Sequence, residues 1–208
     1  GSVLALLAFL LAFTFDIASS RFDQRKQLVM DESDAIEAAY LRADLLPDPQ
    51  RNEAKEILRA YTAQRAGLTQ DPEVIRRIVA DSDKLQARLW DVAREAARGD
   101  APQALVALFI GSVNLIIDLH SDRVTLGLQY RIPPVIWWCL AAVTFLAMAG
   151  VGYQFGLAGR ENVWVQALLA LSFSAVIWLI ANLDQPWGVL TVSQQPIIEL
   201  AEKIAVPR

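Results

Sequence analysis

Three long stretches of the chain carry no charged side chain: residues 1–15, 132–159 and 162–183. An α-helix rises about 1.5 Å per residue, and the hydrocarbon core of a bilayer, roughly 30 Å thick, needs about 20 apolar residues. The second and third stretches are therefore predicted to be membrane-spanning helices, joined as an antiparallel hairpin by a short loop that contains Arg160. A buried hairpin of a soluble protein is the alternative, but two uncharged helices of this length are rare in soluble cores.

The first apolar stretch, Val3 to Phe15, is too short to cross a bilayer unless it continues. It could be a signal peptide, a re-entrant helix or a span whose beginning lies before residue 1. A signal peptide has a basic leader and a small-residue cleavage site, and neither is visible here. We therefore expect a membrane helix over residues 1–18 that begins before residue 1.

The remaining residues predict helices throughout, and no alternating strand pattern of useful length occurs. Asp48–Pro49 and Asp71–Pro72 have the order of an N-cap followed by a first helical residue, and Gly99–Asp100 pairs a helix end with a new N-cap. The pattern predicts an all-α fold, with helices over residues 3–45, 49–66, 72–98, 101–130, 134–157, 162–183 and 194–204.

The segment 101–130 is the ambiguous one. Its first 17 residues are uncharged, but Asp118, His120, Asp122 and Arg123 follow. Apolar residues recur on one helical face, which favours a packed helix of a bundle that could dip into the membrane at one end. A separate membrane span is the alternative.

The predicted segments are a membrane helix (1–18), a helical cytoplasmic region (19–131), a transmembrane hairpin (132–184) and a cytoplasmic tail (185–208). Because the hairpin returns the chain to the side on which it started, the charged region and the tail lie on one side. The many acidic residues obscure the count of basic residues on the two sides of the membrane. The positive-inside rule still favours the cytoplasm for the charged region and the tail. A multi-pass membrane protein is expected.

Composition narrows the possible functions. Hydrophobic residues make up 54% of the chain and charged residues 20%, with a net charge of −4, so nucleic acid is not an expected partner. The single cysteine, Cys139, cannot form an internal disulfide, and no Cys/His cluster exists to hold zinc. No nucleotide loop or nucleophile motif is present. We expect neither a metal nor a cofactor, and no enzyme.

Some polar clusters are predicted to be ordinary helix surfaces, either solvated or salt-bridged. Asp118, His120 and Asp122 are two residues apart, so they point to different faces of a helix and do not converge. The acidic pairs Asp31–Glu32 and Asp81/Asp83 are interpreted in the same way.

The segment from Leu10 to Phe22 is unusual because an apolar helix runs into a charged one without Pro or Gly. Ala5, Phe9 and Phe13 recur every four residues, Arg21 follows Phe13 by eight, and the aromatic Phe22 comes next. This arrangement resembles the second membrane helix of the bestrophin channels, in which a ring of apolar residues at this spacing forms the pore neck.

Further segments identify the chain as a member of the bacterial bestrophin-like family of membrane proteins, which is distantly similar to bestrophin channels. The matching segments are 11–15, 21–23, 39–47, Arg131-Ile132-Pro133-Pro134, and Leu183-Asp184-Gln185-Pro186 with Gly188 and Val192-Ser193. They are distributed over almost the whole chain.

The resemblance implies a homopentamer in a lipid bilayer, the inner membrane of a bacterium, with a central pore for small ions. It also implies that these ions are anions. Ala5, Phe9 and Phe13 would form the pore neck, and Asp16 and Ser20 would line the pore mouth. Arg21 would be either an interfacial anchor or the ion-pair partner of an acid on a neighbouring helix, and the pairing role is favoured.

The chain also departs from the bestrophin pattern. Ala5 replaces a bulky neck residue, Asp23 stands where a second aromatic is expected, and Arg25–Lys26 lie about one residue out of register. The acidic calcium-binding run of animal bestrophins has no counterpart, which leaves calcium gating in doubt. A non-conducting membrane scaffold or sensor, whose helical region binds a partner, is the alternative function.

Overall fold

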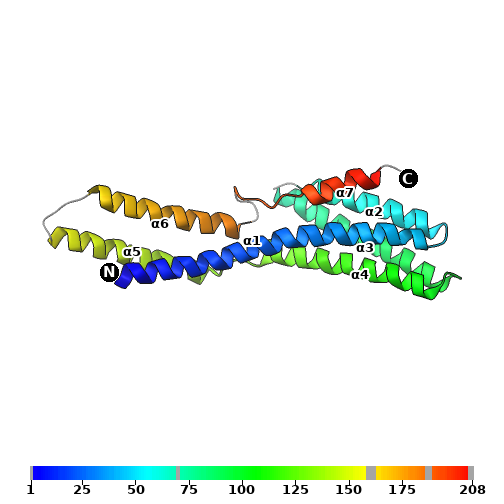
Figure 1. The fold of residues 1–208 in the computed structure, drawn as a ribbon, viewed down its shortest axis with the longest axis horizontal. Helices are drawn as coiled ribbons and strands as arrows, with labels where there is room; N and C mark the ends of the chain where they lie inside the picture. The colour runs from blue at the N-terminus through cyan, green and yellow to red at the C-terminus, as the bar shows by residue number, and fades with distance from the viewer. Residues whose placement is uncertain (1, 69–70, 158–162, 186–188, 206–208) are drawn as a thin grey trace. The chain divides into compact units, whose positions relative to one another are not determined.

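The structure is a computed structural model that describes residues 2–68, 71–157, 163–185 and 189–205. In this part of the chain all regular secondary structure is helical (Figure 1), which confirms the predicted all-α fold. The helices are α1 (Ser2–Arg42), η1 (Ala43–Leu45), α2 (Gln50–Ala66), α3 (Pro72–Arg98), α4 (Gln103–Val124), the π-helical turn η2 (Thr125–Gln129), α5 (Pro134–Leu157), α6 (Val163–Asp184) and α7 (Gln195–Ala205). Each helix range predicted from the sequence overlaps one of the α-helices, from α1 to α7 in order. Arg160, Pro186 and Gly188 lie outside the described residues.

One of the three predicted helix starts is confirmed and two are wrong. The Asp71 side chain accepts a hydrogen bond from the Glu73 backbone N–H at 2.9 Å, which caps α3 as expected. The residues before α2 and α4 are instead Pro49 and Pro102. At both places a backbone carbonyl accepts from an amide of the first turn, Pro47 O from Arg51 N and Pro102 O from Leu105 N, where an N-cap side chain was expected to accept.

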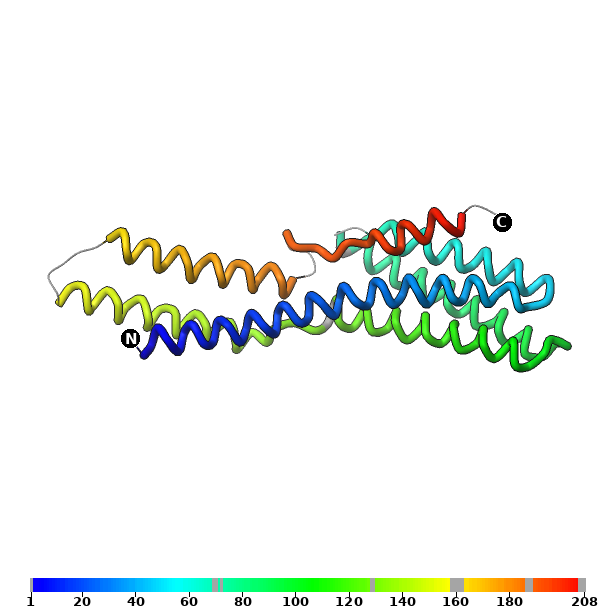
Figure 2. The backbone as a smooth tube through the Cα atoms, in the orientation of Figure 1, coloured from blue at the N-terminus to red at the C-terminus, as the bar shows by residue number. Residues whose placement is uncertain are grey.

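The chain divides into two compact units. Unit 1 contains Gly1–Gln24 and Tyr130–Thr191, and unit 2 contains Arg25–Gln129 and Val192–Arg208. The single helix α1 contributes its first part to unit 1 and its second part to unit 2 (Figure 2).

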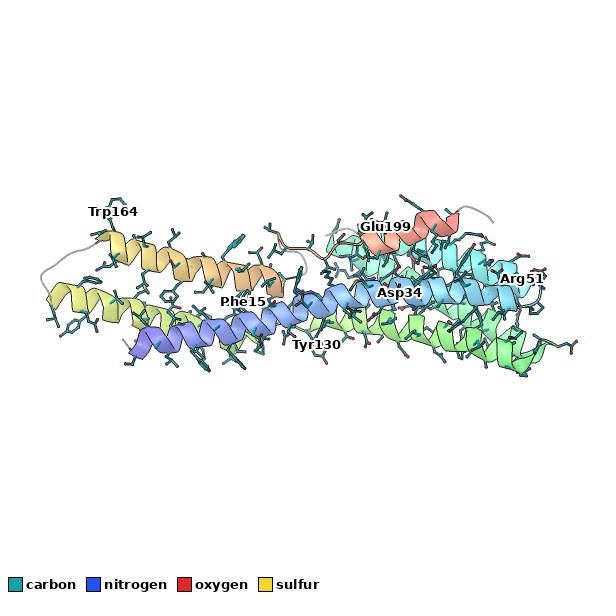
Figure 3. The ribbon with its side chains drawn as sticks, viewed as in Figure 1. Phe15, Asp34, Arg51, Tyr130, Trp164 and Glu199 are labelled. Carbon is teal, nitrogen blue, oxygen red and sulfur yellow. The ribbon has the colours of Figure 1, made fainter. Side chains whose placement is uncertain are left out.

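Unit 1 consists of the first part of α1 with α5 and α6, which run antiparallel (Figure 1). Its small interior includes Leu7, Leu11, Leu140, Ala147 and Ile180. Most apolar side chains of α5 and α6 point outward, since only 11% and 6% of their most apolar 18-residue windows are buried. At the start of α6, Trp164 projects outward with 81% of its surface exposed (Figure 3).

Unit 2 is a bundle of α2, α3, α4 and α7 with the second part of α1. Its core is larger and includes Ile36, Leu58, Leu89, Phe109 and Ile116, each at most 2% exposed. Its surface carries most of the charged side chains of α2 and α3, together with exposed leucines such as Leu108 and Leu115.

Among the described residues, four helices are long and apolar enough to cross a membrane: those within Ser2–Leu45, Gln103–Gly127, Pro134–Leu157 and Val163–Asp184. The second of these, α4, has the most buried window at 39%, and it packs inside unit 2. We therefore assign α4 to the bundle, as the apolar stripe predicted.

Candidate functional site

The first part of α1 has one buried face. Leu7, Leu11, Thr14 and Ala18 are at most 4% exposed, and they follow one another at spacings of four, three and four residues. This spacing keeps side chains on one side of a helix. The Thr14 hydroxyl is accommodated among apolar neighbours because it donates to the Leu10 carbonyl oxygen at 2.7 Å. This face is the one that α1 packs into the interior of unit 1.

The residues predicted to form the pore neck and pore mouth lie on the opposite face. Ala5, Phe9, Phe13, Asp16 and Ser20 are all exposed, with Phe9 at 67% and Phe13 at 59%. Their spacings of four, four, three and four residues place them in one line along the helix. At 1.5 Å per residue, the uncharged part from Ala5 to Phe13 is about 12 Å long. The structure thus brings these five residues onto one exposed face, uncharged at its start and polar at its end.

Three separate segments of unit 1 meet at Asp184, the last residue of α6, which is 5% exposed. Its Oδ1 accepts a hydrogen bond from Ile132 N at 3.0 Å and lies 3.6 Å from an Arg21 guanidinium nitrogen. The Asp184 carbonyl oxygen accepts from Arg131 at 2.9 Å. Arg21, Arg131–Ile132 and Asp184 all come from the segments on which the family resemblance was based. These contacts join α1 to the residues just before α5 and to the last residue of α6, which gives the matching segments a structural role.

A second polar site, which sequence reasoning missed, lies inside unit 2. Glu32 is fully buried, and its carboxylate pairs with Arg123 and with Arg65 Nε at 3.1 Å. It also accepts a hydrogen bond from the Tyr61 hydroxyl at 2.8 Å. The expectation that Glu32 lies on a solvated face is wrong. One carboxylate here faces two guanidinium groups, so the buried cluster carries an excess positive charge.

A signal for this buried acid was present in the sequence. Glu32 lies three residues after Val29 and four before Ile36, both nearly or fully buried, so it belongs to the apolar stripe of α1. Asp31, its neighbour, is only partly buried, and Asp34 is exposed on the same helix (Figure 3). An acid within an apolar stripe is typical of a buried ion pair rather than of a solvated face.

The surroundings of Glu32 change its acidity and that of Tyr61. Burial alone would raise the pKa of Glu32, but Arg123 and Arg65 outweigh it and hold the pKa below its ordinary value. Burial, together with the charge of Glu32, raises the pKa of Tyr61. Glu32 is therefore ionised and Tyr61 is a neutral hydrogen-bond donor at pH 7.

His120 is also buried, at 4% exposure, so the expectation of a solvated His120 is wrong. Its ring meets Tyr61 edge-on at 6.5 Å between centroids, and Nε2 lies 3.3 Å from an Asp83 carboxylate oxygen. Neither ring nitrogen has a hydrogen-bond partner of good geometry among the described residues. Burial and the nearby Arg65 lower the pKa of His120. Asp118 and Asp122, in contrast, are exposed as expected.

Gln86 extends this cluster, since its side-chain amide donates to the Tyr61 hydroxyl at 3.3 Å. At the other end, Arg123 donates to the Gln194 side chain at 2.9 Å. The described residues contain no group of three or more His, Cys, Asp or Glu side chains that could hold a metal ion.

Comparisons with known proteins place this geometry in context. A family model described as the Bestrophin-like domain matches residues 1–197. Two crystal structures of a bacterial bestrophin homolog from Klebsiella pneumoniae, each of a variant with one mutation, have a similar fold. Their TM-scores are 0.72 and 0.71 at 15% and 14% identity, and the matches cover 97% and 98% of this chain and 82% and 86% of the homolog. A search of curated proteins finds no match.

Proposed function

Because the chain belongs to the Bestrophin-like domain family and has the bestrophin fold, known for ion channels, we propose that it forms an oligomeric ion channel with a hydrophobic pore neck. The chain is a membrane protein rather than a member of an enzyme class. The proposal rests mainly on one observation: α1 buries Leu7 and Leu11 inside its own unit and leaves Phe9 and Phe13 exposed on the opposite side.

In the proposed assembly, five chains contribute one α1 helix each to a central pore. Phe9 and Phe13 form two rings in the neck, and the smaller Ala5 leaves a wider ring before them. A narrow apolar constriction expels water, so it passes ions only when it widens. Asp16 and Ser20 follow at the polar mouth.

The conducted ions are proposed to be anions, by the resemblance to bestrophins. The neck itself is uncharged, so its only electrostatic contribution is the positive edge of each phenylalanine ring, which attracts a partly dehydrated anion. Residues 19–131 and 185–208 are placed in the cytoplasm, with residues 1–18 and 132–184 in the inner membrane of a bacterium. Arg21, paired with Asp184 at 3.6 Å, has a structural role in this arrangement.

The test is planar-bilayer recording of the purified oligomer in matched salt gradients. Phe9→Ala and Phe13→Ala remove bulk from the neck, so each should raise the current through the channel. Phe145→Ala is the matched control, because Phe145 on α5 is equally exposed, at 73%, but lies outside the proposed neck. The reversal potential in the gradient measures the preference for anions.

The number of subunits, measured by native mass spectrometry, provides an independent check. Five subunits support the channel. A monomer or dimer, together with absence of current in the wild type and in both neck variants, favours the non-conducting scaffold instead.

A further inference from the structure

Unit 2 contains a cleft of about 390 Å³ between α3 and α4. It is lined by Asp83, Gln86, Ala87, Trp90, Asn114 and Ile117. The cleft is shallow and largely open to solvent, so it suits a small ligand held at the surface of the bundle. Neither the channel proposal nor the buried ion pairs of Glu32 account for this cleft.

The charges of the cleft favour a cationic ligand. Among the residues that line it, Asp83 is the one charged side chain, and 64% of that side chain is exposed. His120 lies next to Asp83, and its lowered pKa keeps the ring neutral at pH 7. The negative charge of Asp83 is therefore not offset by His120. Gln86 directs an amide N–H to Tyr61 and has its carbonyl oxygen left as an acceptor.

The apolar part of the cleft favours an organic cation over a metal ion. Trp90 lines it from α3 and is 39% exposed, and Ile117 lines it from α4. An indole face attracts an alkylammonium group by a cation–π interaction, with Trp the best of the aromatic side chains for it. A metal ion would need several carboxylate or imidazole ligands, and the cleft offers one carboxylate.

We propose that this cleft binds a small organic ammonium ion, with its charge at Asp83 and its alkyl groups against Trp90 and Ile117. A bound ligand that contacts Gln86 is connected to helix α1 through two further hydrogen bonds, from Gln86 to Tyr61 and from Tyr61 to Glu32.

The experiment is isothermal titration calorimetry of the purified oligomer with tetramethylammonium chloride, compared with sodium chloride and with the neutral isostere tert-butanol. Of the three compounds, only tetramethylammonium is expected to give a binding heat that saturates as more is added. Asp83→Asn keeps the shape of the side chain but removes its charge, and it should weaken binding by about tenfold. Trp90→Phe should weaken it by about threefold, because Phe is a poorer cation–π partner.

Asp81→Asn is the matched control. Asp81 is on the same helix and forms a surface ion pair with Lys84 at 2.7 Å, but it does not line the cleft. It should bind tetramethylammonium as the wild type does. Absence of saturable heat in the wild type overturns the site, and so does equal binding by Asp83→Asn or equal binding of tert-butanol. Because calorimetry needs no ionic current, the result is independent of whether the chain conducts ions.

Discussion

The two units of this chain place their apolar side chains in opposite directions. In unit 2 most large apolar side chains are buried, and Phe109 is fully buried. In unit 1, Phe145 on α5 is 73% exposed and Leu171 on α6 is 67% exposed, while few residues are buried. The same residue types thus form the inside of one unit and the outside of the other, which indicates two different solvents.

The difference also changes what holds each unit together. Burial of apolar surface from water stabilises unit 2, as in any soluble domain. Between helices in lipid that driving force is absent, so packing and polar contacts must fix their arrangement. In unit 1 the contacts of Asp184 with Arg21, Arg131 and Ile132 fulfil this role. In unit 2 the buried Glu32 is an added specific contact within an apolar core.

The largest effect is expected from the buried acid of unit 2. Glu32→Ala leaves the guanidinium groups of Arg65 and Arg123 buried without their carboxylate, which should destabilise unit 2 by about 3–5 kcal/mol. Hydrogen exchange of the α2 and α4 amides, followed by mass spectrometry, measures this loss. Amides of α5 should keep their protection.

Glu37→Ala is the control for that variant. Glu37 is on the same helix but pairs at the surface with Lys203 at 2.5 Å, and exposed pairs contribute about 0–1 kcal/mol. Equal losses in the two variants would show that the buried cluster of Glu32 does not stabilise the bundle.

A slightly smaller effect compares one residue type in the two units. Phe109→Ala opens a cavity in the core of unit 2 and should cost about 3–4 kcal/mol. Phe145→Ala on the exposed surface of α5 should change stability by less than about 1 kcal/mol, because a lipid-facing ring leaves no cavity. Chemical denaturation of the protein in lipid nanodiscs, followed by local hydrogen exchange, measures both. If Phe145→Ala proves as costly as Phe109→Ala, the assignment of α5 to a lipid-facing surface is wrong.

The helices could be predicted from the sequence because their signals are local. The uncharged runs at 132–159 and 162–183 set the positions of α5 and α6, and Asp71 with Gly99 marked the ends of α3. Asp48 and Asp100 were misassigned as caps because a neighbouring backbone carbonyl can satisfy the same amide hydrogens. Such competition depends on backbone geometry that residue type alone does not determine.

The partners of the polar residues could not be predicted in this way. Glu32 and His120 were both interpreted as solvated, since Arg65, Tyr61 and Asp83 come from helices whose packing is long-range. The spacing of Ala5, Phe9 and Phe13 did predict a shared helical face, and the structure shows that this face is exposed. That the face lines a pore depends on other chains and remains a proposal.

The smallest effect concerns pH and again separates the two units. His120 is the only histidine of the chain, and its ring meets Tyr61 from α2 and Asp83 from α3. The charges of Arg65 from α2, Glu32 from α1 and Arg123 on its own helix also act on it.

Burial lowers the pKa of His120 in the folded state below its ordinary 6.5, so between these two values the unfolded chain binds more protons. The stability of unit 2 should therefore be constant between pH 7 and the ordinary tyrosine pKa of 10.0, and fall as the pH drops below 6.5. The lowered pKa of Glu32 adds nothing in this window, because its stabilisation is lost only below the ordinary value of 4.5. Hydrogen exchange of unit 2 at pH 7.5 and 5.5, corrected for the intrinsic rate at each pH, measures this loss of stability.

The stability of unit 2 should depend less on pH in the His120→Gln variant than in the wild type, whereas the exchange of α5 and α6 should be the same in both proteins. An unchanged pH dependence in His120→Gln would mean that His120 is not buried as a neutral ring.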